Sequence, residues 1–262
     1  MRNQCSVCAF IPSRVFVLTA LMLIVSPVWS ATTLVAVAAN FTKPMTEIAA
    51  EFEKATGHTA KLSFGSSGKF VAQIENGAPF EVFMAADQEN AVKLQTAGLA
   101  VADTRFTYAL GKLVLWSATP GYVDEQGEVL GKAIFKHLAL ADPKLAPYGA
   151  AAVEVLKNLG LQEKLQLLLV QGENISQTHQ FVSTGNAELG FVALSQVIEN
   201  GKIASGSGWI VPERYYAPIR QDAILLTIGE DNPAALALLK FLKGSEASAI
   251  ILKYGYSLPG QP

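Results

Sequence analysis

The chain of 262 residues contains only two cysteines and carries almost no net charge. Cys5 and Cys8 both precede the first long apolar run, so we expect the mature protein to have neither a disulfide nor a thiol-based site. Lysine and arginine number 20 against 22 aspartate and glutamate residues. Because this balance indicates no basic face, we do not expect a nucleic acid partner.

The sequence also lacks an apolar run long enough to span a bilayer. Arg2 and Arg14 precede the run 15–25, which Ser26-Pro27 interrupts. About eleven apolar residues are too few for a membrane helix but suit a secretory signal peptide, with cleavage after Ser30. We therefore predict a signal peptide over residues 1–30 and a secreted mature protein. Without the two arginines, 18 basic and 22 acidic residues remain, a net charge of −4.

Predicted strands and helices alternate along the mature chain. Thr32–Ala38 and Thr59–Phe64 are typical of short strands, and each is followed by apolar residues at helical spacing. This alternation predicts an α/β fold with a parallel sheet whose function lies at the carboxyl ends of the strands. Leu110–Ser117 is expected to form one further strand.

No linker or repeat divides the chain, so two lobes would require the chain to pass between them more than once. We place these crossings near Leu110 and Arg220. The predicted domains are residues 1–30 as signal peptide, 31–110 plus 221–262 as lobe 1, and 111–220 as lobe 2.

A serine-rich turn, Gly65-Ser66-Ser67-Gly68-Lys69, joins a predicted strand to a predicted helix. Serines at a helix start can cap the backbone or donate hydroxyl protons to an anion beside unpaired N–H groups. The letters also fit S-x-x-K, but the partner motifs of an acylating serine enzyme are absent. Phe70 follows Lys69 where a nucleotide-binding P-loop has serine or threonine.

Four predicted turns share the arrangement of a strand followed by a helix start: those at Asn40, Ser66-Ser67, Tyr148-Gly149 and Ile175-Ser176. In two facing lobes these turns can meet at one ligand, and four helix N-termini of about +0.5 charge each suit a dianion. No lysine or arginine is needed. We interpret Lys43 and Lys69, although close in sequence, as solvated surface lysines.

Several motifs together resemble the periplasmic molybdate-binding proteins of ABC importers, across residues 32–258. The motifs are Ala38-Ala39-Asn40-Phe41-Thr42, Phe64-Gly65-Ser66-Ser67-Gly68, Gly77-Ala78-Pro79-Phe80-Glu81-Val82-Phe83, Ala85-Ala86-Asp87, Ala141-Asp142-Pro143 with Pro147-Tyr148-Gly149, Gly172-Glu173-Asn174-Ile175 and Lys253-Tyr254-Gly255-Tyr256. The resemblance implies a class II periplasmic-binding-protein fold, two doubly wound α/β lobes with a ligand cleft between them.

The same resemblance implies which residues hold molybdate or tungstate. Ser67 matches a serine ligand of the family, and Asn40 stands where many members have a serine. Tyr148 and Ile175 match positions that act chiefly through backbone N–H groups, and Ala39 completes the expected oxyanion site. Where many members have a ligand tyrosine, this chain has Ala193. Our hypothesis is that the Tyr148 hydroxyl replaces it.

The expected protein is a periplasmic, monomeric binding protein with no cofactor, no direct metal-ion ligand and no enzymatic activity, and its expected partner is a membrane permease. An alternative is a binding protein for sulfate, phosphate or a small organic ligand. Porphobilinogen deaminase-like enzymes have similar lobes, but they attach their cofactor through a cysteine, which the mature chain lacks. A Ser/His/Asp hydrolase would need His58, His137 or His179 beside Ser67.

Overall fold

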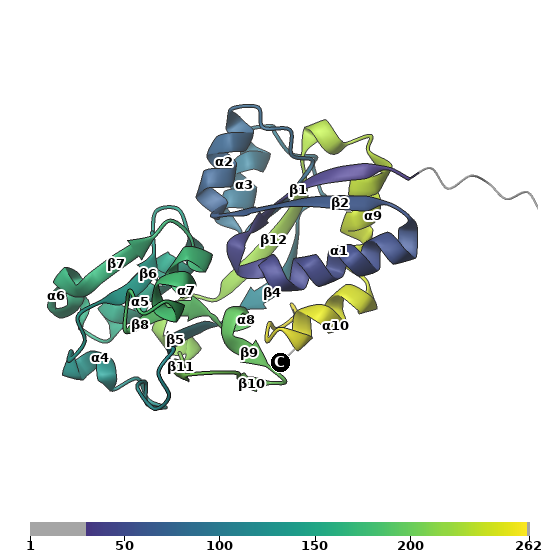
Figure 1. Ribbon diagram of the computed structural model, residues 1–262. Helices are drawn as coiled ribbons and strands as arrows, with labels where there is room; N and C mark the ends of the chain where they lie inside the picture. Colours follow the sequence, from purple (N-terminus) through teal and green to yellow (C-terminus); the bar gives the residue numbers. More distant parts are fainter. Residues whose placement is uncertain (1–29, 261–262) are drawn as a thin grey trace, which may run out of the picture.

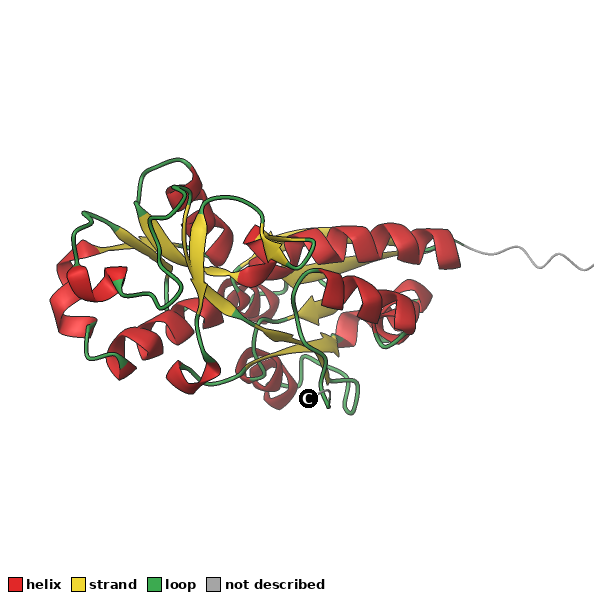
Figure 2. Cartoon of the chain, turned by 90° about the horizontal axis from the view of Figure 1, so that it is seen from below, coloured by secondary structure: helices red, strands yellow, loops and turns green. Residues whose placement is uncertain are grey.

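The computed structural model describes residues 30–260, in which two α/β lobes lie side by side (Figure 1). The predicted signal peptide, apart from Ser30, lies outside the described residues, as do residues 261–262. Figure 2 shows that helices flank the strands in both lobes, which together form an elongated molecule. None of the helices within residues 30–260 has the length and apolar character needed to cross a membrane.

The first lobe contains a five-stranded sheet of order β2-β1-β3-β12-β4. Its strands are β1 (Thr32–Ala38), β2 (Thr59–Gly65), β3 (Val82–Met84), β4 (Phe106–Gly111) and β12 (Ile219–Leu225). The first three are parallel to one another, whereas β12 runs antiparallel to both β3 and β4. The parallel pairing expected from the alternation of strands and helices is confirmed for β1, β2 and β3. The complete sheet is mixed, because β12 returns from the other lobe to fill the place between β3 and β4.

Helices cover both faces of this sheet. They are α1 (Thr42–Thr56), α2 (Ser67–Glu75), α3 (Glu89–Thr96), α9 (Pro233–Leu242) and α10 (Ser245–Lys253), with the short 3-10 helices η1 (Ala39–Phe41) and η4 (Thr227–Gly229). Val35 and Val37 belong to the core beneath α1, α9 and α10, and Ala36 belongs to the opposite core beneath α2 and α3. This alternation explains why β1 is apolar from Leu34 to Ala38, because successive side chains enter two separate cores.

The second lobe repeats the architecture with a sheet of order β11-β5-β8-β6-β7. Its strands are β5 (Leu113–Ser117), β6 (Leu138–Ala141), β7 (Leu169–Gly172), β8 (Leu189–Ala193) and β11 (Ser207–Ile210), beside a small hairpin of β9 (Ile198–Glu199) and β10 (Lys202–Ile203). The helices are α4 (Val129–Lys132), α5 (Pro147–Asn158), α6 (Gln162–Leu165), α7 (Ile175–Ser183) and α8 (Leu194–Val197), with η2 (Gln166–Leu168) and η3 (Glu213–Tyr215). Here too the sheet is mixed, since β5 is antiparallel to β8 and to β11.

The chain passes from the first sheet to the second and back again. The segment expected as one strand over Leu110–Ser117 is two strands, because β4 ends at Gly111 in the first sheet and β5 begins at Leu113 in the second. The chain returns before Ile219, where β12 begins. The domain limits at residues 110 and 221 stay a prediction.

Two neighbouring polar side chains of β12 are buried beside a β-bulge in β4. The pairing shifts register between Gln221, opposite Ala109, and Asp222, opposite Thr107, so the extra residue is Tyr108 of β4. Gln221 and Asp222 are both fully buried, and successive side chains of a strand point to opposite faces. Gln221 thus reaches the region between the lobes, while Asp222 enters a polar cluster of its own lobe.

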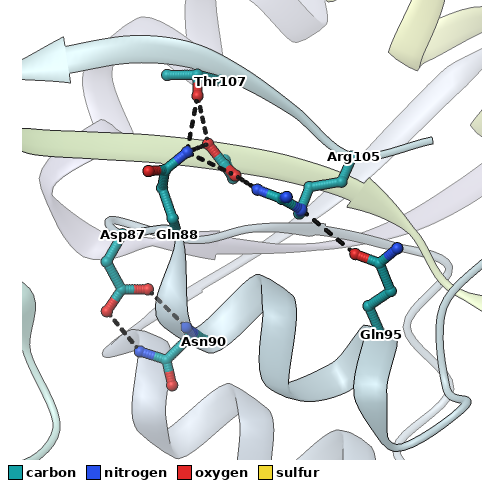
Figure 3. Close-up of polar contacts among 7 residues, drawn as sticks. Asp87, Gln88, Asn90, Gln95, Arg105 and Thr107 are labelled. Atoms are coloured by element: carbon teal, nitrogen blue, oxygen red, sulfur yellow. Dashed lines mark hydrogen bonds and ion pairs between the residues drawn. The ribbon is translucent and has the colours of Figure 1, made fainter. Parts of the chain in front are cut away.

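The Asp222 carboxylate is surrounded by donors (Figure 3). The Arg105 guanidinium forms an ion pair with Asp222 Oδ2, and the Thr107 hydroxyl donates to Oδ1 at 2.7 Å. Gln88 Nε2 lies 3.4 Å from both carboxylate oxygens. In the same view Asp87 accepts from the backbone and side chain of Asn90, which holds the start of α3. The contacts with Arg105, Thr107 and Gln88 compensate the burial of the Asp222 charge and tie the middle of β12 to the start of β4.

We expect Asp222→Asn to lower the free energy of unfolding by about 2 kcal/mol, because it weakens charge-assisted hydrogen bonds at a buried site while preserving side-chain shape. Urea unfolding followed by circular dichroism measures the change. Glu128→Gln, in an exposed pair with Lys132, is the control and should leave stability unchanged. Equal stabilities for Asp222→Asn and wild type would contradict the role given to this cluster.

Candidate functional site

A pocket lies between the two lobes where their strands end and helices begin. Its cavity volume is about 10 Å³, roughly the space of one water-sized sphere. The lining residues are Ala38, Ala39, Asn40, Gly65, Ser66, Ser67 and Ala86 from the first lobe, and Ala146, Pro147, Tyr148, Asn174 and Ile175 from the second. All five predicted site residues, Ala39, Asn40, Ser67, Tyr148 and Ile175, are among them. The structure therefore brings together segments up to 136 positions apart in the sequence.

Four helix starts supply this lining. The N-cap residues are Ala38 for η1, which leads into α1, Ser66 for α2, Ala146 for α5 and Asn174 for α7. The first N–H groups of a helix have no intrahelical acceptor, and the helix dipole gives each N-terminus a partial positive charge. The pocket thus presents hydrogen bond donors and positive potential from two helices of each lobe.

None of the lining residues carries a charged side chain. The two nearby lysines are engaged outside the pocket: Lys69 pairs with Glu173 at 2.5 Å, and Lys43 Nζ donates to the Gln196 carbonyl at 3.0 Å. Both contacts link one lobe to the other. The interpretation of these lysines as surface residues agrees with their place outside the lining, although the structure adds a contact across the lobes for each.

Ser67 is buried, and its hydroxyl oxygen accepts a hydrogen bond from the Ala86 backbone N–H at 2.9 Å. A hydroxyl has one proton to donate besides its two acceptor positions. The bond from Ala86 therefore orients the oxygen and leaves the proton available to a ligand in the pocket. Tight packing of Ala86 after β3 against the start of α2 is what positions this serine.

Ser66 precedes it and is buried too, with 3% of its surface exposed. Although it occupies the N-cap position of α2, its side chain makes no capping hydrogen bond. Among residues 30–260, its hydroxyl oxygen finds no hydrogen bond partner at all. The sequence indicated that serines at this turn could cap the helix or donate to an anion, but it could not show which hydroxyl lacks a partner.

Asn40 directs its side chain away from the role that the sequence suggested. Its amide nitrogen donates to Gln221 Oε1 at 2.7 Å and to the Tyr256 hydroxyl at 2.9 Å. A carboxamide has two N–H donors, and both are used in these bonds. The side chain therefore cannot donate to a ligand as a serine would, and the backbone at Ala39 and Asn40 is what faces the pocket with donor capacity.

The Tyr148 hydroxyl also belongs to a network that joins the lobes. It accepts from Gln221 Nε2 at 3.2 Å, and Gly111 lies so close to it that any side chain at position 111 would collide with the hydroxyl. Burial raises the pKa of Tyr148 well above its ordinary value. It likewise raises the pKa of Tyr256 to about 12. Both phenols therefore remain neutral at physiological pH.

Gln221 lies at the centre of this network and was missed by the sequence analysis. Its carboxamide contacts Asn40 and Tyr108 through oxygen and Tyr148 through nitrogen. Ser195 extends the network from the second lobe, since its hydroxyl donates to the Asn40 carbonyl at 2.8 Å. Asn40 and Gln221 are 181 positions apart. No local pattern could have paired them.

The remaining predicted positions are held by contacts around α7. The Ser176 hydroxyl donates to the Ala39 carbonyl at 3.2 Å, again across the lobes. The Gln196 side chain donates to the Ile175 carbonyl at 3.1 Å and accepts from the Ala193 N–H at 3.0 Å. Ala193 is buried but does not line the pocket. Its methyl group supplies no hydroxyl there.

The main chains of the two lobes also meet beside the serine turn. The Gly68 N–H donates to the Leu145 carbonyl at 3.0 Å, a backbone contact between α2 and the loop before α5. A Cβ atom at position 68 would lie 3.2 Å from both the α-carbon and the carbonyl oxygen of Leu145. Glycine therefore favours this approach, because a larger residue would push the Leu145 main chain away by a few tenths of an ångström. Within the described part of the chain, no cluster of three or more histidine, cysteine or acidic residues could hold a metal ion.

Comparisons with known proteins identify the family of this chain. The family model for bacterial extracellular solute-binding proteins matches residues 33–257. The molybdate-binding protein ModA of Azotobacter vinelandii is 63% identical over 224 residues, covering 86% of this chain and 89% of that protein. ModA of Rhodobacter capsulatus is 54% identical over 241 residues, covering 91% and 94%.

Solved structures also match this chain to a molybdate-binding protein. The periplasmic molybdate-binding protein of Azotobacter vinelandii superposes with a TM-score of 0.84 at 44% identity, covering 87% of this chain and 99% of that one. The sulfate-binding protein SubI of Mycobacterium tuberculosis H37Rv has a TM-score of 0.69 at 14% identity, covering 88% of both chains, which shows the shared fold alone. The chain belongs to the bacterial extracellular solute-binding proteins and, within them, to the family of molybdate-binding proteins of ABC importers.

Proposed function

We propose that this protein captures molybdate, and tungstate with it, in the pocket between the lobes and delivers the anion to a membrane permease. The observation that carries the proposal is a buried pocket formed by four helix N-termini and free of charged side chains. The names of the relatives supply the identity of the anion. They do not favour the alternative of a sulfate- or phosphate-binding protein.

The electrostatics of the pocket suit a dianion. Four helix N-termini contribute about +0.5 charge each, so together they offset roughly two negative charges. Hydrogen bonds to a charged group contribute about 1.5–3 kcal/mol each, and five or six of them supply the ~8–10 kcal/mol of a micromolar or tighter complex after ordering costs. A pocket of donors also disfavours a protonated anion, which would direct a donor against a donor.

The predicted residues divide into backbone and side-chain donors. Ala39 and Asn40, together with Tyr148 and Ile175, offer N–H groups from the first turns of their helices. Ser67 offers its hydroxyl proton. The hypothesis that the Tyr148 hydroxyl compensates for the methyl group of Ala193 retains support from its neutral state and from its position in the wall of the pocket.

Delivery requires a protein outside the cytoplasm whose two lobes can separate. We propose that residues 1–30 direct export to the periplasm and that the mature protein works as a monomer. An anion that bonds to both lobes at once favours the form in which they meet. A permease that recognises both lobes of this form would then receive only loaded protein.

Calorimetric titration of the purified mature protein should show micromolar or tighter binding of molybdate and tungstate, because both are dianions with four acceptor oxygens. Sulfate is expected to bind more weakly because of its smaller size, and hydrogen phosphate because of its proton. Each anion is titrated into the same preparation after dialysis to remove bound anion. Tighter binding of sulfate or phosphate than of molybdate would contradict the proposal.

Replacing Ser67 tests the predicted hydroxyl ligand. Ser67→Ala should weaken molybdate binding about 10- to 100-fold, since a hydrogen bond to a charged group contributes about 1.5–3 kcal/mol. Ser183→Ala, on the exposed side of α7, is the matched control and should bind as wild type does. The assignment fails if both variants keep wild-type affinity in calorimetry.

Tyr148→Phe removes one hydroxyl and leaves the backbone N–H in place. We expect molybdate binding to weaken about 10- to 100-fold, because the hydroxyl would donate to a charged group and such a hydrogen bond contributes about 1.5–3 kcal/mol. Tyr122→Phe, outside the pocket, provides the control. Wild-type affinity in Tyr148→Phe would show that the backbone of residue 148 suffices and that its hydroxyl replaces nothing.

A further inference from the structure

Ser66 is a buried polar residue that the structure leaves unexplained. It lines the pocket with 3% of its surface exposed, and its hydroxyl has no hydrogen bond partner among the described residues. Removing a hydroxyl from water without giving it a partner is unfavourable, so buried hydroxyls are nearly always paired. A partner outside the protein would resolve this exception.

Helix capping does not account for the residue. Elsewhere in the molecule, N-cap side chains do cap: Asn174 accepts from the Ser176 and Gln177 N–H groups, and Asn232 accepts from the Ala234 N–H. Ser66 occupies the same position at α2 and accepts from none. Its hydroxyl therefore serves neither the helix nor another side chain of the described residues.

The other unpartnered buried hydroxyl, on Thr33, helps to define what is special about Ser66. Thr33 lies near the start of β1 and does not line the pocket. Among residues 30–260, only Ser66 combines an unsatisfied hydroxyl with a place among the donors of four helix starts. Next to it, the hydroxyl oxygen of Ser67 is already oriented by the Ala86 N–H. The two neighbouring hydroxyls thus differ: one is held by the protein, and the other is left for the ligand.

We propose that the Ser66 hydroxyl is a further donor to the bound oxyanion, in addition to the residues of the proposed function, on which this inference rests. The anion oxygen completes the hydrogen bonding of Ser66, and the serine turn then contributes two hydroxyl protons from adjacent residues. Because the hydroxyl gains its partner only on binding, its effect falls on anion affinity and not on the stability of the empty protein.

Ser66→Ala tests this assignment by calorimetry with molybdate and by thermal unfolding with and without molybdate. We expect affinity to fall about 10-fold or more, and the melting temperature without anion to stay the same or rise. Thr33→Val, which removes the other unpartnered buried hydroxyl, is the matched control and should keep wild-type affinity. Ser66→Gly, which is well tolerated at an N-cap, provides a second variant should the alanine form fold poorly.

Two results would overturn the inference. One is wild-type molybdate affinity in Ser66→Ala and Ser66→Gly, which would leave a bound water as the partner of this hydroxyl. The other is a melting temperature of anion-free Ser66→Ala that falls in proportion to its loss of affinity. That result would show that Ser66 stabilises the fold. If wild type itself fails to bind molybdate, the proposed function fails. If wild type binds molybdate and Ser66→Ala binds it equally well, the inference about Ser66 fails and the proposed function stands.

Discussion

The pocket depends on one buried carboxamide, that of Gln221, which connects residues of both lobes. It fixes the Asn40 side chain through its oxygen and reaches the Tyr148 hydroxyl through its nitrogen. It projects from the middle of β12, and the next residue, Asp222, anchors the same strand to Arg105 and Thr107. Since β12 is the strand by which the chain returns to the first lobe, the geometry of the crossing and the geometry of the pocket are set together.

Neutral chemistry in the pocket follows from this arrangement. Buried side chains near the anion are occupied with one another, as those of Asn40 and Gln221 are, so the groups that remain are backbone N–H groups and serine hydroxyls. Rigid backbone donors need little reorganisation when an anion arrives. Lysines stay at the rim, where Lys43 and Lys69 bridge the lobes and do not meet the ligand.

The sequence predicted the meeting of Asn40, Ser67, Tyr148 and Ile175 because each follows a strand and opens a helix, and the carboxyl ends of parallel strands share one edge. The prediction of one strand over Leu110–Ser117 was wrong, because the chain leaves the first sheet and enters the second at Lys112. Periodicity indicates burial but does not identify the neighbouring strand. It also could not reveal the donors already consumed at Asn40 or the one left over at Ser66. Those depend on contacts with residues far away in the chain.

The backbone contact between Gly68 and Leu145 has a consequence for ligand size. At 3.0 Å the two main chains are already at hydrogen bonding distance, and the glycine leaves no side chain that could be trimmed to bring them nearer. The chamber therefore has a minimum width fixed by peptide groups. A tetrahedral ion with shorter bonds to oxygen would fit loosely between the two walls and could not draw them closer. On the proposed function, this main-chain contact therefore discriminates between ions by size, and substitutions of ordinary side chains would not change it.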